Sequence, residues 1–387
     1  MQLYILDSNY EKLGYIDNAE SVLWNKKLND VGECEVYVPA DKEYVEMLFK
    51  GKYVYREDDD MICELLIPQL ETDVENGDYI IATGYDMKKI LSGRVVNSSI
   101  TYSGSVANFI KKLIVDNVIN PHQPQRAIDN FTFNDSNFNE FKETITINAF
   151  TEDLLELIKT TCKTFNYGFR VKYISDTKTL EFGLFKGLNK ASYDSETYVE
   201  FSPEYSNIIS SNYKEDKSNY KNICYVGYKD LNEAMQMMMV FNTPVEPIGE
   251  DRKETYIDGS GISREVTEEE LKSIYPDVKL NGGSYYNNNV IVANVSDEKI
   301  TVTDDTYLML IKTLGLNTLA SYVKVTEFSG EVDHINSYIY KTDYDLGDVV
   351  KVRNEYGIET EAIITEIMES EDNEDGSVIE PRFEYIN

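Results

Sequence analysis

Histidine is the side chain that most often transfers protons near neutral pH, and only two of the 387 residues are histidine. His122 lies between Pro121 and Pro124, in a segment whose composition predicts a surface loop. His334 follows Asp333 in a strand-like segment. Neither histidine forms part of an HExxH, GxSxG or Cys–His pattern. We therefore predict no histidine-based catalytic site.

Paired carboxylates are a second route to hydrolysis, and the chain has 69 Asp and Glu residues. A glycosidase needs two carboxyl groups about 5 to 9.5 Å apart across a cleft, and the tertiary fold decides that separation. Sugar clefts also commonly use flat aromatic platforms, for which the chain offers one Trp and 30 Tyr. We predict no catalytic residue, with a cell-wall hydrolase kept as an alternative.

Two acidic segments raise the question of a metal ion. The run from Glu371 to Gly376 places Arg382 where an EF-hand loop requires a bidentate Glu. We interpret this run as a turn between strands that end near Met368 and begin near Val378. The second segment, Asp58-Asp59-Asp60, is interpreted as the solvated tip of a hairpin. No metal site is predicted.

No cofactor is predicted either. Two glycine-bearing segments, Gly259-Ser260-Gly261 and Gly282-Gly283, do not follow strands in a phosphate-loop pattern. The four cysteines are at least 29 residues apart, which argues against structural zinc and against a disulfide scaffold. We expect buried thiols, made in a reducing cytoplasm. They are Cys34, Cys63, Cys162 and Cys224.

A methionine cluster allows two interpretations that remain open. Thioether side chains repack against varied partners, so Met235, Met237, Met238 and Met239 would suit an adaptable contact surface. Such a run can equally belong in part to the core.

The elements that must position these residues begin with short antiparallel strands. Cys34, Val36 and Val38 alternate with polar neighbours, the period of a half-buried strand. Further strands are predicted at 3–5, 13–16, 52–56, 61–67 and 79–81. Asn76-Gly77 before the last of these is a strong hairpin signal. This pattern predicts a barrel or sandwich.

Helices are predicted next. Val106, Phe109, Ile110, Leu113, Ile114 and Val118 have helical spacing, and a second helix starts near Thr151 with Glu152 and Asp153 in its first turn. A hairpin over 168–185 follows. The stretch 229–300 is the least regular, with a capping box from Thr267 to Glu270. A covered helix is expected over 308–319, and strands at 322–328, 348–352, 360–367 and 378–385.

Composition and charge exclude several functions. The formal charge is −32, and an acidic surface repels the phosphates of nucleic acids. The longest apolar runs are far shorter than the ~20 residues of a membrane helix. The N-terminal residues lack the basic region of a signal peptide. The length predicts two or three domains.

Several short segments, in one order along nearly the whole chain, carry a family resemblance. They are 3–7, 14–17, 21–24, 32–39, 84–86, 91–96, 201–205, 207–209, 222–227, 343–350 and 363–367. Together they resemble the phage tail-tip hub proteins of siphophages. This baseplate hub family is related in fold to the hub beneath contractile tails and to the N-terminal part of tail-associated lysins.

The resemblance implies a homotrimer whose β-barrels form a ring of pseudo-sixfold symmetry. It implies the distal tail or tail tube protein, the tape measure protein and receptor-binding or fibre proteins as partners. DNA would pass through the lumen without specific binding, and the protein would lie at the virion tail tip after assembly in the host cytoplasm. Longer relatives carry enzymatic or receptor-binding extensions, whereas this chain stops at Asn387. We therefore expect a structural hub and no enzyme.

The predicted fold is α+β and β-rich, with antiparallel tube-like β-barrels and inserted helix-hairpin modules. Residues 1–97 form a tube-like barrel, and 98–200 an α+β helix-hairpin module. Residues 201–325 supply second-barrel strands with an irregular helical insertion, and 326–387 close a barrel. We also hypothesise that acidic side chains line the lumen, with charge spread evenly for solubility as the alternative. A host-surface-binding module is a further alternative function.

Overall fold

Strands dominate the described residues, as predicted, and six α-helices lie between these strands. The structure is a computed structural model that describes residues 2–59, 61–72, 77–96, 99–150, 152–193, 197–332, 338–372 and 376–385. The fold is therefore α+β and β-rich.

Among the described residues, thirteen strands form one large mixed sheet. Its main order is β14-β23-β26-β25-β3-β4-β7-β6-β5-β1-β2, while β24 pairs with β25 and with β13. The N-terminal strands are β1 (Leu3–Leu6), β2 (Lys12–Ile16), β3 (Ser21–Lys27), β4 (Glu33–Pro39), β5 (Tyr53–Arg56), β6 (Met61–Glu71) and β7 (Tyr79–Asp86). The later ones are β13 (Glu200–Phe201), β14 (Ile208–Asp216), β23 (Val325–Val332), β24 (Val349–Arg353), β25 (Glu359–Asp372) and β26 (Gly376–Tyr385).

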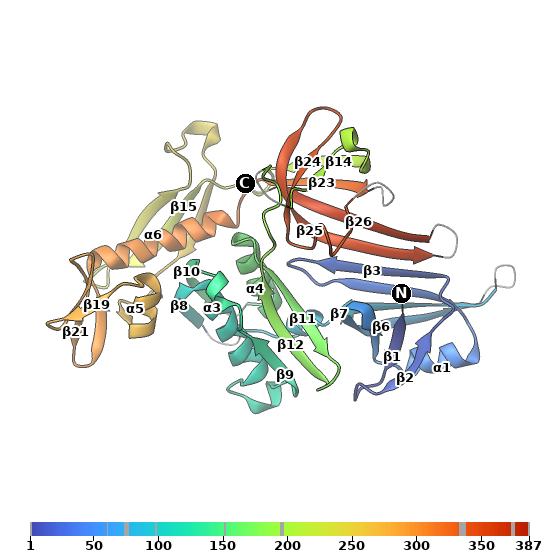
Figure 1. Cartoon of the computed structure of the whole chain (residues 1–387). Coiled ribbons are helices and arrows are strands. Elements are labelled where there is room, and N and C mark those ends of the chain that lie inside the picture. The colour runs from blue at the N-terminus through green and yellow to red at the C-terminus, as the bar shows by residue number, and fades with distance from the viewer. Residues whose placement is uncertain are drawn as a thin grey trace.

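The two ends of the chain meet inside this sheet. β3 pairs with β25 in antiparallel register, so that Trp24 is opposite Glu369. Figure 1 shows the blue N-terminal strands directly beside the red C-terminal ones. The first and last predicted parts thus share backbone hydrogen bonds, and the division of the chain into four parts stays a prediction.

Alternation of apolar residues explains the buried face of the N-terminal strands. In β4 the side chains of Cys34, Val36 and Val38 are fully buried, which confirms the predicted period. Helix α1 (Lys42–Lys50), which the sequence analysis did not anticipate, begins where the Asp41 side chain accepts a hydrogen bond from the backbone N–H of Tyr44. It covers one side of this core.

Two predicted hairpins are confirmed by strand pairing. β6 and β7 pair up to Glu71 and Tyr79, and Gly77 beside the turn has a φ of +87°. Only glycine adopts that angle without steric cost. β25 and β26 pair up to Asp372 and Gly376. Both tips, including Asn76 and residues 373–375, lie outside the described residues.

The helix-hairpin module is built around two helices. α3 (Val106–Ile114) continues into the π-turn η2 (Val115–Ile119), and the predicted inward residues are fully buried. α4 (Leu154–Thr164) begins later than predicted, because Asp153 is its N-cap and accepts from the Glu156 N–H. The other elements are α2 (Lys89–Ser92), β8 (Ser99–Ser105), β9 (Phe131–Asn134), β10 (Thr144–Phe150), β11 (Gly168–Ile174), β12 (Thr179–Phe185) and the 3-10 turns η3 (Pro124–Arg126) and η4 (Phe138–Glu140).

Residues 222–320 form a more regular lobe than predicted. Helix α6 (Asp304–Ala320) covers the sheet β16-β15-β17, and a Cβ on its Gly315 would lie 2.9 Å from methyl groups of Val226 and Val240. Glycine therefore permits the close approach of helix to sheet. The predicted capping box at Thr267 opens α5 (Glu268–Ile274). The strands are β15 (Ile223–Lys229), β16 (Met235–Phe241), β17 (Glu254–Asp258), β18 (Glu265–Val266), β19 (Lys279–Asn281), β20 (Ser284–Asn287), β21 (Val290–Ser296) and β22 (Lys299–Val302). The lobe also contains the 3-10 turn η6 (Gly249–Asp251), and η5 (Pro203–Tyr205) precedes it.

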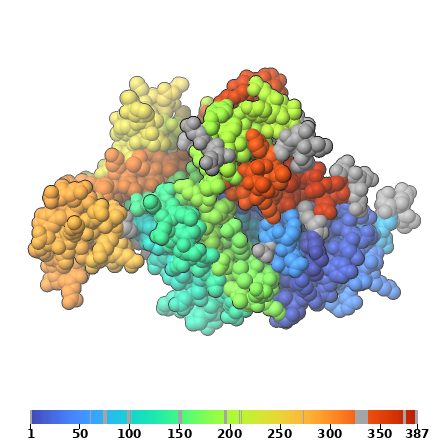
Figure 2. Space-filling view, in the orientation of Figure 1, coloured from blue at the N-terminus to red at the C-terminus, as the bar shows by residue number. Residues whose placement is uncertain are grey.

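The arrangement of the parts is visible in two views. In Figure 1 the α6 lobe lies at the left, the helix-hairpin module in the centre, and the large sheet at the right. The space-filling view in Figure 2 shows the same lobe projecting to one side of the molecule. Within the described ranges, no helix is long and apolar enough to cross a membrane.

Candidate functional site

A buried group of charged side chains lies where the N-terminal strands meet the C-terminal ones. We call Lys26, Arg56, Asp58, Asp59, Lys341 and Glu369 the ion cluster. Arg56 Nη2 is 2.8 Å from Glu369 Oε2, and its Nε and Nη2 bind both carboxylate oxygens of Asp58. The side chains of Arg56 and Glu369 are only 5% and 8% exposed. Burying two charges costs desolvation energy, so such a pair contributes to stability only where each charge has good partners.

Lysines complete the ion cluster. Lys26 Nζ is 2.5 Å from Glu369 Oε1 and also contacts the Asp59 carboxylate. Lys341 Nζ is 2.5 Å from Asp59 Oδ1. Burial alone would lower the pKa of Arg56, but hydrogen bonds to Asp58 and Glu369 outweigh it, and the pKa is raised. The guanidinium is therefore always charged and needs these carboxylates.

The structure corrects the interpretation of Asp58-Asp59-Asp60 as a solvated tip. The turn η1 (Glu57–Asp59) folds back onto the sheet, and the Asp59 side chain is only 15% exposed. The Asp59 carboxylate forms ion pairs with Lys26 and Lys341, which hold the side chain against the sheet. Asp58 is half exposed but bonded to Arg56. Asp60 lies outside the described residues.

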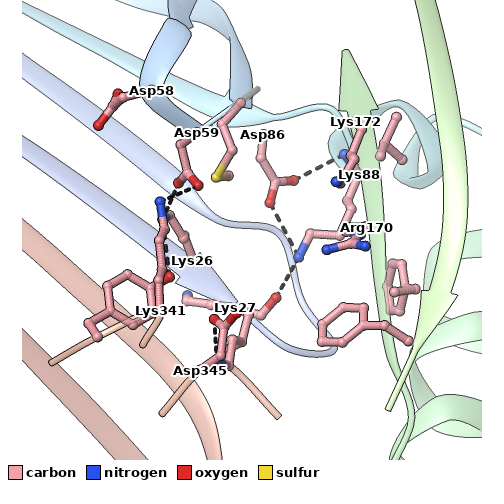
Figure 3. Close-up of a pocket in the computed structure, with 16 residues that line it drawn as sticks. Lys26, Lys27, Asp58, Asp59, Asp86, Lys88, Arg170, Lys172, Lys341 and Asp345 are labelled. Atoms are coloured by element: carbon pink, nitrogen blue, oxygen red, sulfur yellow. Dashed lines mark hydrogen bonds and ion pairs between the residues drawn. The ribbon is translucent and has the colours of Figure 1, made fainter. Parts of the chain in front are cut away.

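Next to the ion cluster is a pocket of about 420 Å³, shown in Figure 3. We call it the basic pocket. It lies between β3, the turn after β7, β11 and β12, and the loop at 340–346. Its charged lining residues are Lys26, Lys27, Asp58, Asp59, Asp86, Lys88, Arg170, Lys172, Lys341 and Asp345. Six of these are basic and four acidic, the reverse of the balance in the whole chain.

Ion pairs and burial set the electrostatics of the basic pocket. Lys88 Nζ lies 3.3 Å from Asp86 and donates to the backbone oxygen of Lys27. Burial raises the pKa of Asp86, although Lys88 opposes the shift. Burial also raises the pKa of Asp345, which makes no ion pair among the described residues. Burial lowers the pKa of Arg170.

A second buried ion pair joins the helix-hairpin module to β24. Lys190 Nζ is 2.8 Å from Asp348 Oδ2, and both side chains are less than 10% exposed. Asp348 also accepts hydrogen bonds from the backbone N–H groups of Leu188 and Asp345. A Cβ on Gly187 would lie 1.9 Å from the Gly347 oxygen, so the two backbones touch there. This contact fixes the C-terminal wall of the basic pocket.

The candidate catalytic and metal residues stay dispersed. His122 is exposed in a loop, while His334 and Asp333 lie outside the described residues. In the part of the chain that the structure describes, no group of three or more His, Cys, Asp or Glu side chains could hold a metal ion. Gly282 and Gly283 have positive φ in an exposed turn between β19 and β20.

All four cysteines are free and buried, as predicted. Burial raises the pKa of Cys224 to about 11, and raises the pKa of Cys162 further. Thiols in this state are unreactive, because the thiolate is the nucleophile. They act as small core residues.

The methionine cluster divides between surface and core. Met235, Met237 and Met239 point to solvent on β16, with exposures of 56%, 62% and 36%. Met238 is half-buried against the core beneath α6. Met238 thus belongs in part to the core, whereas a role of the other three methionines as a contact surface stays a prediction.

No sequence pattern predicted the ion cluster or the basic pocket, although Asp58 and Asp59 were considered as a possible metal site. One signal was available, because Lys26 follows Val22 and Trp24 at period two and so belongs to the buried face of β3. Arg56 similarly ends a strand whose four residues are all buried. The pairing of β3 with β25 decides which carboxylates lie next to Lys26 and Arg56, and the sequence does not show that pairing.

Comparison with solved structures first shows that the fold is similar to that of a tail protein. A tail protein from Neisseria meningitidis MC58 matches with a TM-score of 0.52 and 10% identity, over 99% of this chain and 95% of that one. Prophage tail protein gp18 from Listeria monocytogenes EGD-e (TM-score 0.48, 12% identity, 99% and 94% covered) also matches. So does the prophage MuSo2 43 kDa tail protein from Shewanella oneidensis (0.47, 10%, 99% and 98%).

The family follows from the sequence profile described as Siphovirus ReqiPepy6 Gp37-like protein, which matches residues 2–383. The chain belongs to this siphovirus tail protein family. No curated protein matches the chain. The resemblance found in the sequence is thus confirmed for a phage tail protein family, and membership implies a location in the virion tail.

Proposed function

We propose that this protein is the structural hub at the distal tip of a siphophage tail. It would assemble as a homotrimeric ring that adapts the hexameric tail tube or distal tail ring to the tip or receptor-binding apparatus. The observation that carries this proposal is the family match over residues 2–383. The tape measure protein and fibre proteins would be its other partners, and DNA would cross the lumen without specific binding.

The exposed β-structure of the α6 lobe supports an assembly role. Met235, Met237 and Met239 share one face of the β16-β15-β17 sheet with Tyr225 and Tyr256, and α6 covers the other face. β16 and β17 are the edge strands of this sheet. Contiguous apolar surface and open strand edges are typical of proteins that join others.

The mass of the purified chain in solution tests the proposal. A monomer has 44.5 kDa, so a trimer has about 134 kDa by light scattering. We expect that mass for the chain alone, or a larger complex that contains three copies of the chain after mixing with the tail tube protein, together with threefold rings in electron micrographs. A chain that stays monomeric even beside the tail tube protein contradicts the proposal.

A cell-wall hydrolase is the alternative from a different class. It predicts turnover of purified peptidoglycan by the chain, with loss of activity after a single Glu or Asp substitution. A host-surface-binding module predicts saturable binding to host cells without association with tail proteins. The hub predicts neither result. Acidic residues along the lumen belong to the hub proposal, and a neutral or basic bore in a trimer structure refutes that part.

A further inference from the structure

The basic pocket is an exception to the charge of the chain. The whole protein carries a formal charge of −32, yet basic residues outnumber acidic ones in the pocket wall. Its acidic side chains are largely committed to neighbours: Asp59 pairs with Lys26 and Lys341, and Asp86 pairs with Lys88. The pocket therefore has positive charge left over.

The surplus charge belongs to three side chains. Lys27 on β3 and Arg170 and Lys172 on β11 make no ion pair within 4.0 Å among the described residues. Arg170 and Lys172 are two positions apart on one strand, so they share a face at a spacing of about 6.6 Å. Glu181, opposite Lys172 in the ladder, instead accepts a hydrogen bond from Asn134.

Arg170 is held in an environment that favours an incoming anion. Its guanidinium carbon lies 5.2 Å from the centre of the Phe185 ring, within the range of a cation–π contact. Burial lowers the pKa of Arg170 even though Asp345, Glu181 and Asp59 act in the opposite direction. The Arg170 side chain is exposed, so an anion that enters the pocket from solvent can reach its charge. In Figure 3, Arg170, Lys172 and Lys88 lie together on the β11 side of the pocket.

The size and the apolar part of the pocket indicate a small organic ligand. A volume of about 420 Å³ lies within the range of small-molecule sites, which are apolar with a few placed polar groups. The apolar wall consists of half-buried side chains, which are Met61, Val171, Phe185 and Leu346. An acidic peptide would need an open groove instead.

We propose that the basic pocket binds a phosphate monoester, with Lys27, Arg170 and Lys172 around the phosphoryl oxygens. A monoester carries about 1.5 to 2 negative charges at neutral pH and offers three strong acceptor oxygens. An Arg fork binds such a group with two parallel hydrogen bonds, and lysines add point charges. The organic part of the ligand lies against Phe185, whose side chain is half-buried. This assignment goes beyond the proposed role in tail assembly and does not depend on it.

Isothermal titration calorimetry of the full chain at constant ionic strength tests the proposal. Glucose 6-phosphate should bind saturably at one site per chain and more tightly than inorganic phosphate, while glucose should not bind. Arg170→Gln should weaken binding by at least about tenfold, since charge-assisted hydrogen bonds are the strong ones. Lys172→Gln should weaken it several-fold. Lys279→Gln, at an exposed residue of β19 in the distant lobe, is the matched control and should bind as the wild type does.

Three results would overturn the proposal. The first is the absence of saturable binding to the wild-type chain at tens of millimolar ligand. The second is equal binding by the wild type and by Arg170→Gln with unchanged Trp24 fluorescence, because the site would then lie elsewhere. The third is equal or tighter binding of a glutamate-rich peptide, which would assign the pocket to an acidic segment of another protein. Equal binding of inorganic phosphate would refute the role of the aromatic wall.

Discussion

Replacing Glu369 by Gln tests whether the ion cluster holds the N- and C-terminal strands together. The substitution keeps the size of the side chain and removes its charge. Arg56 and Lys26 then lose one shared carboxylate, while Asp58 and Asp59 remain. Glu369 is 8% exposed, so water replaces little of the lost interaction.

The magnitude follows from the geometry. Two unit charges about 4 Å apart interact by about 4 kcal/mol at an effective dielectric constant of about 20. Removing one partner of a buried ion pair lowers the free energy of unfolding by about 3–5 kcal/mol. Because the remaining carboxylates still compensate Arg56 and Lys26, we expect a loss at or just below that range, about 2–3 kcal/mol in the free energy of unfolding.

The only Trp of the chain reports on this junction. Trp24 is fully buried, pairs with Glu369 across the β3–β25 ladder, and lies 6.0 Å from the Arg56 guanidinium. Urea unfolding followed by Trp24 fluorescence should therefore show a lower midpoint for Glu369→Gln. Glu361→Gln, at an exposed carboxylate on the same strand, is the control and should change stability by less than about 0.5 kcal/mol.

A double-mutant cycle separates the pair from each residue alone. Arg56→Met should destabilise the chain, and the combination with Glu369→Gln should cost less than the two single changes together. A change below about 0.5 kcal/mol for Glu369→Gln, or full additivity in the cycle, would refute the reasoning. The ion cluster would then be a passive feature of the junction.

Three further predictions concern other parts of the chain. Hydrogen bonds from Lys217 and Lys324 lower the pKa of Glu215 to about 2, so its contribution to stability is present above the ordinary value of 4.5 and is lost as the pH falls through about 2. Carboxyl NMR titration checks this shift, and a midpoint near 4.5 contradicts it. Gly187→Ala should destabilise the chain by about 2 kcal/mol or more, because its Cβ meets backbone. Gly93→Ala, with its closest contact at 3.6 Å, should be tolerated, and equal melting temperatures of the two variants would be evidence against the clash. The four buried thiols should not react with Ellman's reagent in the native chain, whereas all four should react after denaturation. Prompt reaction of the native chain would disprove their burial.

Local sequence patterns predicted much of the secondary structure. Alternation in 33–39 and helical spacing in 106–118 marked elements whose apolar residues are now seen fully buried. The capping box at Thr267 marked the start of α5. These predictions succeeded because each depends on neighbours within a few residues. Helix α1 was missed, although Tyr44, Met47 and Leu48 share its buried face and Asp41 caps its start.

The charge, the buried cysteines and the β-rich character were already determined by the amino-acid sequence, because composition and short-range periodicity encode them. Only the tertiary structure decided that Arg56 would meet Glu369, 313 residues later, and that Lys27 and Arg170 would line one pocket. Ion pairing depends on distance in space, and register between distant strands fixes that distance. A sequence without its fold gives the charges but not their partners.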